Sequence, residues 1–227
     1  MAQSLMNNGF DWAVLWQYRA MLGQGLAVTL ALSVVGLIGA TLVGLVAGIA
    51  ATVGGRVSRA VAVGYVEIAR GVPLLVHMYA WYFGLTAVLL PGFLCAVLAL
   101  ASYSGAYMAE VVRAGLQGVP TGQTEAARAL GLSGWQAFRR VVIPQALANV
   151  APSMAGLFSQ LIKDSSLASV IGVAELTFDA GAIEGETFRT FEAYAGITLL
   201  YLVVVTIATR VTIALFGPRA LEAQARA

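Results

Sequence analysis

Charged residues are scarce in this chain. Only 11% of its 227 residues are Asp, Glu, Lys or Arg, whereas soluble domains carry roughly 25%. Hydrophobic residues make up 59% of the chain, and the mean hydropathy is +0.84. A soluble domain of this size could not cover so many apolar side chains with polar groups. The composition therefore argues against a soluble domain and predicts an integral membrane protein.

Cysteine and histidine are almost absent. The single cysteine, Cys95, excludes an internal disulfide, and together with the single histidine, His77, it offers no metal cluster. A net charge of +2 is too small to suggest a nucleic-acid partner. The motifs H-E-x-x-H, G-x-S-x-G and G-x-x-x-x-G-K-[ST] do not occur. An intramembrane enzyme is therefore disfavoured. We expect the chain to bind no cofactor itself and to carry no ATP-binding loop.

Long apolar runs predict an all-α membrane protein, because lipid offers no hydrogen-bond partner for exposed backbone groups. Bilayer-spanning helices need about 20 residues each. On that basis we expect an interfacial N-terminal segment over 1–23 and a transmembrane domain over 24–217. The expected spans cover ~25–53, ~60–88, ~91–117, ~144–163 and ~194–216. They leave a central polar segment at 118–143, a polar loop at 164–191 and a tail at 218–227.

The basic residues between and after these spans predict the orientation. They fall in three regions on one side: Arg56 and Arg59; Arg128, Arg139 and Arg140; and Arg210, Arg219 and Arg226. Cytoplasmic loops of membrane proteins are enriched in Lys and Arg. We therefore expect five spans with the N-terminus outside and the C-terminus inside. The loop over 164–191 is then periplasmic.

Small residues recur every fourth position in the first expected span, at Gly36, Ala40, Gly44 and Gly48. Such a stripe lets the backbone of a neighbouring helix approach closely. We interpret the stripe as a packing surface rather than a functional site.

The central polar stretch, TEAARALGLSGWQAFRRVVIPQAL, predicts two short helices. Thr121 is expected to cap the first, and Gly131 to end it in the left-handed conformation. Ser133 and Gln136 have the spacing of a capping box for the second. A plain interfacial loop between two spans is the alternative that this spacing leaves open.

Ionisable residues inside a membrane are costly and are usually paired or functional. Glu67 and Arg70 lie three residues apart and could pair on one helix face, and Pro73 should kink that helix. The candidates for a polar pathway are Glu67, Arg70, Pro73, His77, Glu110, Lys163, Asp164 and Ser165. Structural roles remain open for each: Glu110 could lock helices by pairing with Arg113, and His77 could contact a serine or a carbonyl group.

Several of these segments resemble bacterial ABC importer permeases. The run EAARALG, followed by a spacer and Ile143-Pro144, resembles their EAA motif, although Val141 and Ile143 depart mildly from it. RGVPLLV at 70–76 resembles the RGTPLLVQ motif of polar amino acid permeases, in which glutamine often occupies the position of His77. AYMAEVVRAG and QLIKDSSL match further segments of that family. The resemblance extends from about residue 25 to about residue 219.

The resemblance implies a type I ABC-importer permease fold with a cytoplasmic coupling helix, in the bacterial inner membrane. It implies a second permease chain, identical or related, two ATPase subunits that hold ATP and Mg, and a periplasmic solute-binding protein. The residues implied in coupling to the ATPase are Glu125, Ala126, Ala127, Leu130, Gly131 and Pro144. The implied function is ATP-driven import of a polar amino acid by alternating access. Two alternatives remain: another small zwitterion, such as an opine or ectoine, and a channel that works without ATP.

Overall fold

The computed structural model describes residues 9–85 and 89–225, and every regular element within them is helical. The helices are α1 (Ala13–Gln17), α2 (Arg19–Val53), α3 (Arg56–Gly71), α4 (Leu74–Gly84), α5 (Gly92–Gln117), α6 (Thr121–Ala129), α7 (Gly134–Ala137), α8 (Ile143–Asp164), α9 (Leu176–Thr187) and α10 (Thr190–Ala225). A π-helical turn over Phe138–Val142 precedes α8, and a 3-10 helix over Ser165–Ile171 follows it. The expectations for residues 1–8, 86–88 and 226–227, which concern the N-terminal segment, the second span and the tail, lie outside the described residues.

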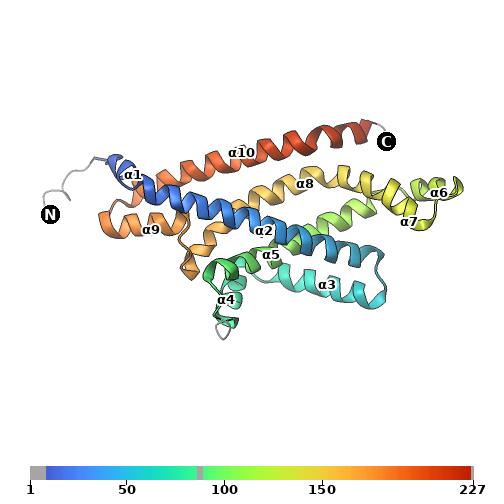
Figure 1. The fold of residues 1–227 in the computed structure, drawn as a ribbon, viewed down its shortest axis with the longest axis horizontal. Helices are drawn as coiled ribbons and strands as arrows, with labels where there is room; N and C mark the ends of the chain where they lie inside the picture. The colour runs from blue at the N-terminus through green and yellow to red at the C-terminus, as the bar shows by residue number, and fades with distance from the viewer. Residues whose placement is uncertain (1–8, 86–88, 226–227) are drawn as a thin grey trace.

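The long helices lie roughly side by side along the longest axis of the molecule (Figure 1). Helices α1 and α9 lie at one end, and α6 and α7 lie at the other. Within the described residues, four helical segments are long and apolar enough to cross a membrane: Arg19–Val53, Gly92–Gln117, Gly134–Ile171 and Thr190–Thr212. The bent pair of α3 and α4 forms a fifth candidate if it is counted as one span.

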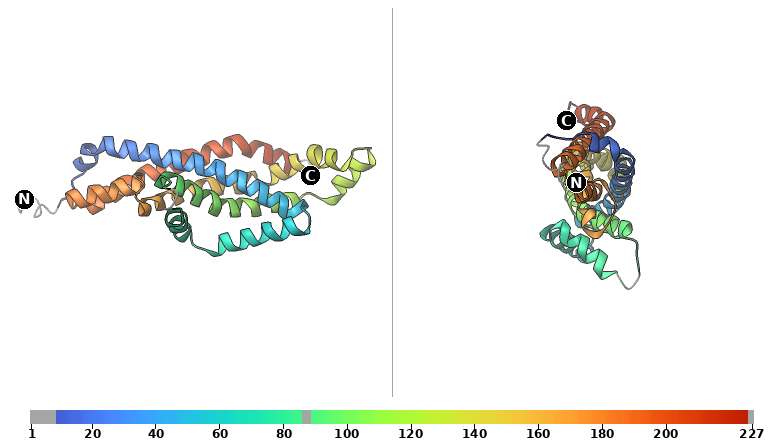
Figure 2. Two further views of the ribbon diagram at one scale, coloured as in Figure 1. Left: turned by 60° about the horizontal axis from the view of Figure 1, so that its bottom comes forward. Right: turned by 90° about the vertical axis from the view of Figure 1, so that its left-hand side faces the viewer.

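A sharp break separates α3 from α4. The two helices meet at 106°, with Val72 and Pro73 extended between them. Proline supplies no backbone N–H, and it disfavours helical geometry in the residue before it. The kink expected at Pro73 is therefore confirmed. It turns α4 out of line with α3, so that α4 lies across the long helices and packs on α5 (Figure 2).

Helix α2 packs most extensively on α5 through the stripe of small residues. A Cβ atom at Gly48 would lie only 2.7 Å from the Val112 side chain and 2.7 Å from the Ala109 carbonyl oxygen. Gly36 and Gly44 are similarly close to Leu100 and Met108. The stripe is therefore a packing surface, as the sequence indicated.

The apolar core lies where α2, α4, α5 and α8 meet. Leu32, Met78 and Leu100 are fully buried there, and Leu161 is 2% exposed. Many large apolar residues on the outer faces of the helices remain exposed. This distribution is the one expected for helices whose outer faces contact lipid.

Candidate functional site: a charged cavity between α3 and α5

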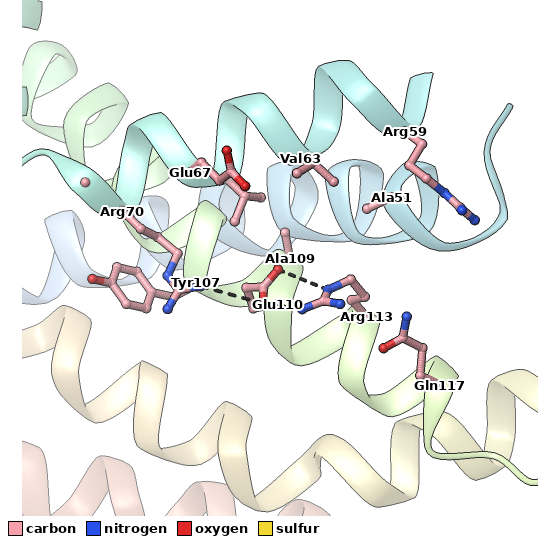
Figure 3. Close-up of a pocket in the computed structure, with 12 residues that line it drawn as sticks. Ala51, Arg59, Val63, Glu67, Arg70, Tyr107, Ala109, Glu110, Arg113 and Gln117 are labelled. Carbon is pink, nitrogen blue, oxygen red and sulfur yellow. Dashed lines mark hydrogen bonds and ion pairs between the residues drawn. The ribbon is translucent and has the colours of Figure 1, made fainter. Parts of the chain in front are cut away.

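A cavity of about 710 Å³ opens between α3 and α5. Both signs of charge line it (Figure 3). Its lining residues are Ala51, Arg59, Val63, Val66, Glu67, Arg70, Gly71, Tyr107, Ala109, Glu110, Arg113 and Gln117. A cavity between two apolar helices that carries several ionisable groups is a candidate passage for a polar solute.

Glu110 is the centre of the charge network. Its Oε1 accepts a hydrogen bond from Arg113 Nε at 3.1 Å, and its Oε2 accepts one from Arg113 Nη2 at 2.7 Å. This fork is the strong, geometrically specific form of the arginine–carboxylate pair. Arg70 reaches the same Oε2 from α3 with Nη1 at 3.6 Å, and its guanidinium lies 5.1 Å from the ring centre of Tyr107 (Figure 3). One carboxylate therefore ties two helices together.

The partner of Arg70 differs from the one expected. The sequence suggested that Glu67 pairs with Arg70 on the same helix, but the pair forms between Arg70 and Glu110 of α5. Glu67 lines the cavity and makes no ion pair or hydrogen bond within residues 9–85 and 89–225. The expected pairing of Glu110 with Arg113 is confirmed.

Aromatic side chains continue the site along α5. The hydroxyl groups of Tyr103 and Tyr107 lie 3.3 Å apart, and His77 packs edge-on against Tyr103 with ring centres 5.5 Å apart. Tyr103, Tyr107, Glu110 and Arg113 follow one another at spacings of four, three and three residues, which places them on one helix face. Tyr107 was not among the pathway candidates expected from the sequence, although this spacing could have identified it.

The structure does not bring Lys163, Asp164 and Ser165 into this cavity. Asp164 Oδ1 accepts a hydrogen bond from Gln160 at 2.8 Å. Ser165 is fully buried and donates to the carbonyl oxygen of Ile162 at 2.8 Å. Lys163 is exposed. These three residues end α8 and begin the 3-10 helix, apart from the residues that line the cavity.

The central polar stretch forms two short helices at the far end of the molecule, α6 and α7 (Figure 1). Gly131 has a φ of +85° directly after α6, and the N–H of Leu132 bonds back to Ala127 O at 3.2 Å. Ser133 and Gln136 form the expected capping box. The expectation for Thr121 is wrong: Pro120 occupies the N-cap position, and Thr121 is already the first helical residue.

The outer face of α6 is open to contact. Glu125 and Ala126 are exposed, and Leu130 just beyond the helix is 83% exposed. Ala127 is buried, so it holds α6 on the molecule instead of belonging to the open face. Pro144 is the second residue of α8 and directly follows the π-helical turn, so it lies within the continuous helical segment Gly134–Ile171. These positions leave a short helix with small and apolar side chains available to another protein.

A second polar cluster lies near the other end, where α2, α9 and α10 meet. Glu175 is fully buried and caps α9, because its Oε1 accepts the N–H groups of Thr177 at 2.8 Å and Phe178 at 3.0 Å. Its Oε2 accepts hydrogen bonds from Tyr201 at 2.7 Å and from Thr29 at 3.4 Å. This cluster was not expected from the sequence, because its members are far apart in the chain.

Asp179 lies one turn further along α9 and is only 3% exposed. Its Oδ2 is buried and has no hydrogen-bond partner within the described part of the chain. Burial, together with the charge of Glu175, raises the pKa of the Asp179 carboxyl to about 6, against the opposing effect of the Gly25 backbone N–H. Burial also raises the pKa of Glu175, although four hydrogen bonds oppose that shift.

Comparison with known proteins assigns the chain to a family. Residues 40–221 match the family of binding-protein-dependent transport system inner membrane components. The chain belongs to this family. It is therefore a membrane-embedded permease subunit of an ABC importer, located in the inner membrane, and not an enzyme. Permeases of binding-protein-dependent systems work with a solute-binding protein and an ATPase.

Individual relatives agree with this assignment. The glutamine transport system permease protein GlnP of Escherichia coli (strain K12) is 38% identical over 199 residues, which cover 86% of this chain and 91% of GlnP. The octopine transport system permease protein OccM of Rhizobium radiobacter is 36% identical over 217 residues, which cover 88% of this chain and 86% of OccM. A chain in a crystal structure of an amino acid ABC transporter with histidines matches with a TM-score of 0.85 and 37% identity, over 93% of this permease and 99% of that chain. The all-helical permease fold expected from the motifs is confirmed.

Proposed function

We propose that this permease carries a polar amino acid across the cytoplasmic membrane, through the cavity between α3 and α5. The observation that carries the proposal is the juxtaposition of Arg70, Glu110 and Glu67 around one cavity. A free amino acid is a zwitterion, so it needs partners of both signs when it leaves water. The similarity to glutamine and amino acid transport proteins supports the same substrate class.

Glu110, Arg70 and Glu67 differ in how strongly each side chain is already paired with another charged side chain. Glu110 is occupied by the fork of Arg113, whereas Arg70 holds its contact to Glu110 only at 3.6 Å. Arg70 can therefore exchange this contact for a substrate carboxylate with little loss. Glu67, which makes no ion pair within the described residues, can receive the substrate ammonium group. Arg70 and Glu67 are the primary binding residues in this proposal, and Glu110 and Tyr107 hold Arg70 in place.

The proposed machinery contains two permease chains, identical or related, and two cytoplasmic ATPase subunits that hold ATP and Mg. In the proposed orientation α1 and α9 face the periplasm, α6 and α7 face the cytoplasm, and five spans place the chain termini on opposite sides. The periplasmic binding protein then delivers solute at the end formed by α1 and α9. The exposed face of α6, with Glu125, Ala126 and Leu130, docks on the ATPase, while Gly131 and Pro144 set the geometry of the loop.

Transport in this scheme is alternating access. Closure of the ATPase subunits moves the coupling helices, and the spans change between inward-facing and outward-facing states. A substrate shifts such an equilibrium only by its difference in affinity for the two states. The contact between Arg70 and Glu110 joins α3 to α5, so a relative movement of these helices would change substrate affinity directly.

A second candidate substrate class is an opine or a related zwitterion such as ectoine. The 36% identity with the octopine permease favours an opine specifically. An opine carries the same carboxylate and nitrogen groups as an amino acid, with an additional carboxylate. The charges that line the cavity, three arginines and two glutamates, are compatible with either class.

The test is uptake by the complete complex in proteoliposomes. The permease, its ATPase and its binding protein are reconstituted, and uptake of each radiolabelled proteinogenic amino acid, of octopine and of ectoine is measured with ATP inside. We expect saturable, ATP-dependent uptake of a polar amino acid. Uptake of octopine or ectoine alone would replace the amino acid proposal with that alternative. Uptake that proceeds without nucleotide would indicate a channel.

A further inference from the structure

The break between α3 and α4 leaves the last backbone carbonyls of α3 without their usual partners, and the carbonyl of Ala69 is one of them. In an uninterrupted α-helix, the carbonyl oxygen of Ala69 would accept the N–H of the residue four positions later. That residue is Pro73, which has no N–H. Ala69 is only 3% exposed, so water has little access to it. A buried carbonyl group in this position requires another donor.

The side chain of His77 supplies that donor. Its Nε2 lies 3.2 Å from Ala69 O. A carbonyl oxygen can only accept a hydrogen bond, so Nε2 carries the proton and Nδ1 has the lone pair in the neutral ring. Nδ1 lies 3.5 Å from Oγ of Ser102 on α5, whose single hydroxyl hydrogen is also within reach of the Ala99 carbonyl oxygen at 3.1 Å. One ring therefore bridges the last turn of α3 and the middle of α5.

Ser102 is the common attachment point for both parts of the bent segment. Trp81 of α4 donates its indole N–H to Ser102 Oγ at 3.0 Å. Tyr65 of α3 donates its hydroxyl hydrogen to the Ser102 carbonyl oxygen. Together with His77, these contacts orient α3 and α4 relative to α5. Only the contact between His77 and Ala69 reaches across the break itself.

We propose that His77 is a positioning residue whose Nε2–H replaces the N–H that Pro73 lacks, and thereby holds Arg70 in the cavity. Arg70 directly follows Ala69 in the last turn of α3. Its guanidinium must reach Glu110 and the Tyr107 ring at the same time. A free Ala69 carbonyl would let this turn unwind toward Pro73 and draw Arg70 away from α5. The role of Arg70 in transport rests on the function proposed above.

Direct contact between His77 and the solute is the competing interpretation. His77 is not among the residues that line the cavity. Both of its ring nitrogens already face protein atoms, Ala69 O and Ser102 Oγ. Positioning through the backbone therefore accounts for its contacts more completely than substrate binding does.

The first test compares two substitutions in the reconstituted complex. H77L keeps an apolar side chain in the space but has no donor, whereas H77Q keeps an N–H donor on a flexible chain. We expect H77L to lower amino acid uptake by about tenfold or more, because a buried acceptor loses its partner, and H77Q to recover most of the wild-type rate. V76A, on the half-exposed neighbouring residue, is the matched control and should behave like wild type. Normal uptake by H77L, or equal loss in H77Q and H77L, would overturn the proposal.

A second comparison restores the missing backbone donor. In P73A residue 73 has an N–H that can reach Ala69 O when residues 72 and 73 become helical, so H77L should cost less uptake in the P73A background than in the wild type. The same fold loss in both backgrounds would contradict the proposed replacement.

A spectroscopic readout does not depend on transport or on any variant. His77 is the only histidine in the chain, so permease labelled with ¹⁵N-histidine and assembled with unlabelled partners gives one pair of ring signals. We expect Nε2 to carry a proton that is hydrogen-bonded to Ala69 O. A ring that carries a proton at Nδ1 and none at Nε2 would refute the positioning role even if uptake is found. Failure of the wild-type complex to import any amino acid would count against the proposed function and not against this hydrogen bond.

Discussion

The carboxylate of Asp179 in α9 occupies the space that a side chain at Gly25 in α2 would need. A Cβ atom built at Gly25 would overlap Oδ2 of Asp179. Gly25 is buried, and the two helices contact each other directly at this point. Glycine at position 25 is therefore a requirement of the contact between α2 and α9.

Replacing Gly25 with alanine should destabilise the permease. The added methyl group must displace the Asp179 carboxylate or separate the helices, and overpacking of this kind costs about 1–3 kcal/mol. Thermal unfolding in detergent should show a lower midpoint for G25A. Gly23 is the matched control: it lies in the same helix, is exposed and has no atom within 4 Å of the place that a methyl group would take, so G23A should be neutral or slightly stabilising. Equal midpoints for G25A and G23A would contradict the tight contact.

Asp179 should make the stability of the permease depend on pH. Its pKa of about 6 in the folded protein lies above that of an exposed aspartate, about 4. Between these two values the folded state binds more protons than the unfolded state. The stability contributed by this carboxyl group therefore falls as pH rises from about 4 to about 6, and it stays lower above that window.

The D179N variant isolates this effect from the other carboxyl groups. Asparagine has a similar shape and does not ionise, so the decline in stability across this pH window should be smaller in D179N than in the wild type. The quantity to compare is the difference between the unfolding midpoints of the wild type and D179N, measured at several pH values from about 4 to about 6. Parallel curves would show that Asp179 titrates like an exposed aspartate.

Removing the Glu110 carboxylate should impair transport without disturbing assembly. In E110A, Arg113 loses both of its hydrogen bonds to Glu110, and Arg70 keeps its contact with the Tyr107 ring but loses its ion pair, so neither cation keeps its carboxylate partner. We expect uptake by the reconstituted complex to fall by about tenfold or more. The ATPase should still copurify, because Glu110 lies away from α6. E186A, at an exposed glutamate near the opposite end of the molecule, should transport normally. Wild-type uptake by E110A would remove Glu110 from the proposed pathway.

The left-handed conformation of Gly131 should be necessary for coupling to the ATPase. A β-branched side chain in this conformation is strained by roughly 1–2 kcal/mol, so G131V should change the angle between α6 and α7. We expect ATP hydrolysis to persist while uptake falls. Gly134 also has no neighbouring atom within 4 Å but does not have a positive φ, so G134A is the control. Coupled transport by G131V at the wild-type rate would support the alternative of a plain connecting loop.

A charge reversal at Glu125 tests whether the exposed face of α6 docks on the ATPase. Glu125 is exposed and is not part of any ion pair within the described residues, so E125K should leave the fold of the permease intact. Its effect should appear only when the ATPase is present, as weaker binding or as hydrolysis without uptake. Unchanged ATPase affinity and unchanged uptake in E125K would remove Glu125 from the docking surface.

Several features of this permease could be read from the sequence because they depend on local chemistry. Long apolar runs indicate membrane-spanning helices, since a helix must satisfy its own hydrogen bonds in lipid. Pro73 marks a local break, because it lacks an N–H and disfavours helical geometry at Val72, although Pro152 lies inside α8 without ending that helix. Gly131 and the pair of Ser133 and Gln136 end one helix and begin the next through bonds within a few residues. The EAA segment placed the chain in its family without any tertiary information.

Tertiary structure decided which distant side chains meet. Arg70 could pair with Glu67 on its own helix or with a residue on another, and the rotation of α3 against α5 selected Glu110. The same packing placed His77 between Ala69 and Ser102, and it buried Asp179 against Gly25. These contacts depend on helix positions set by many apolar contacts together, so no short stretch of sequence contains them.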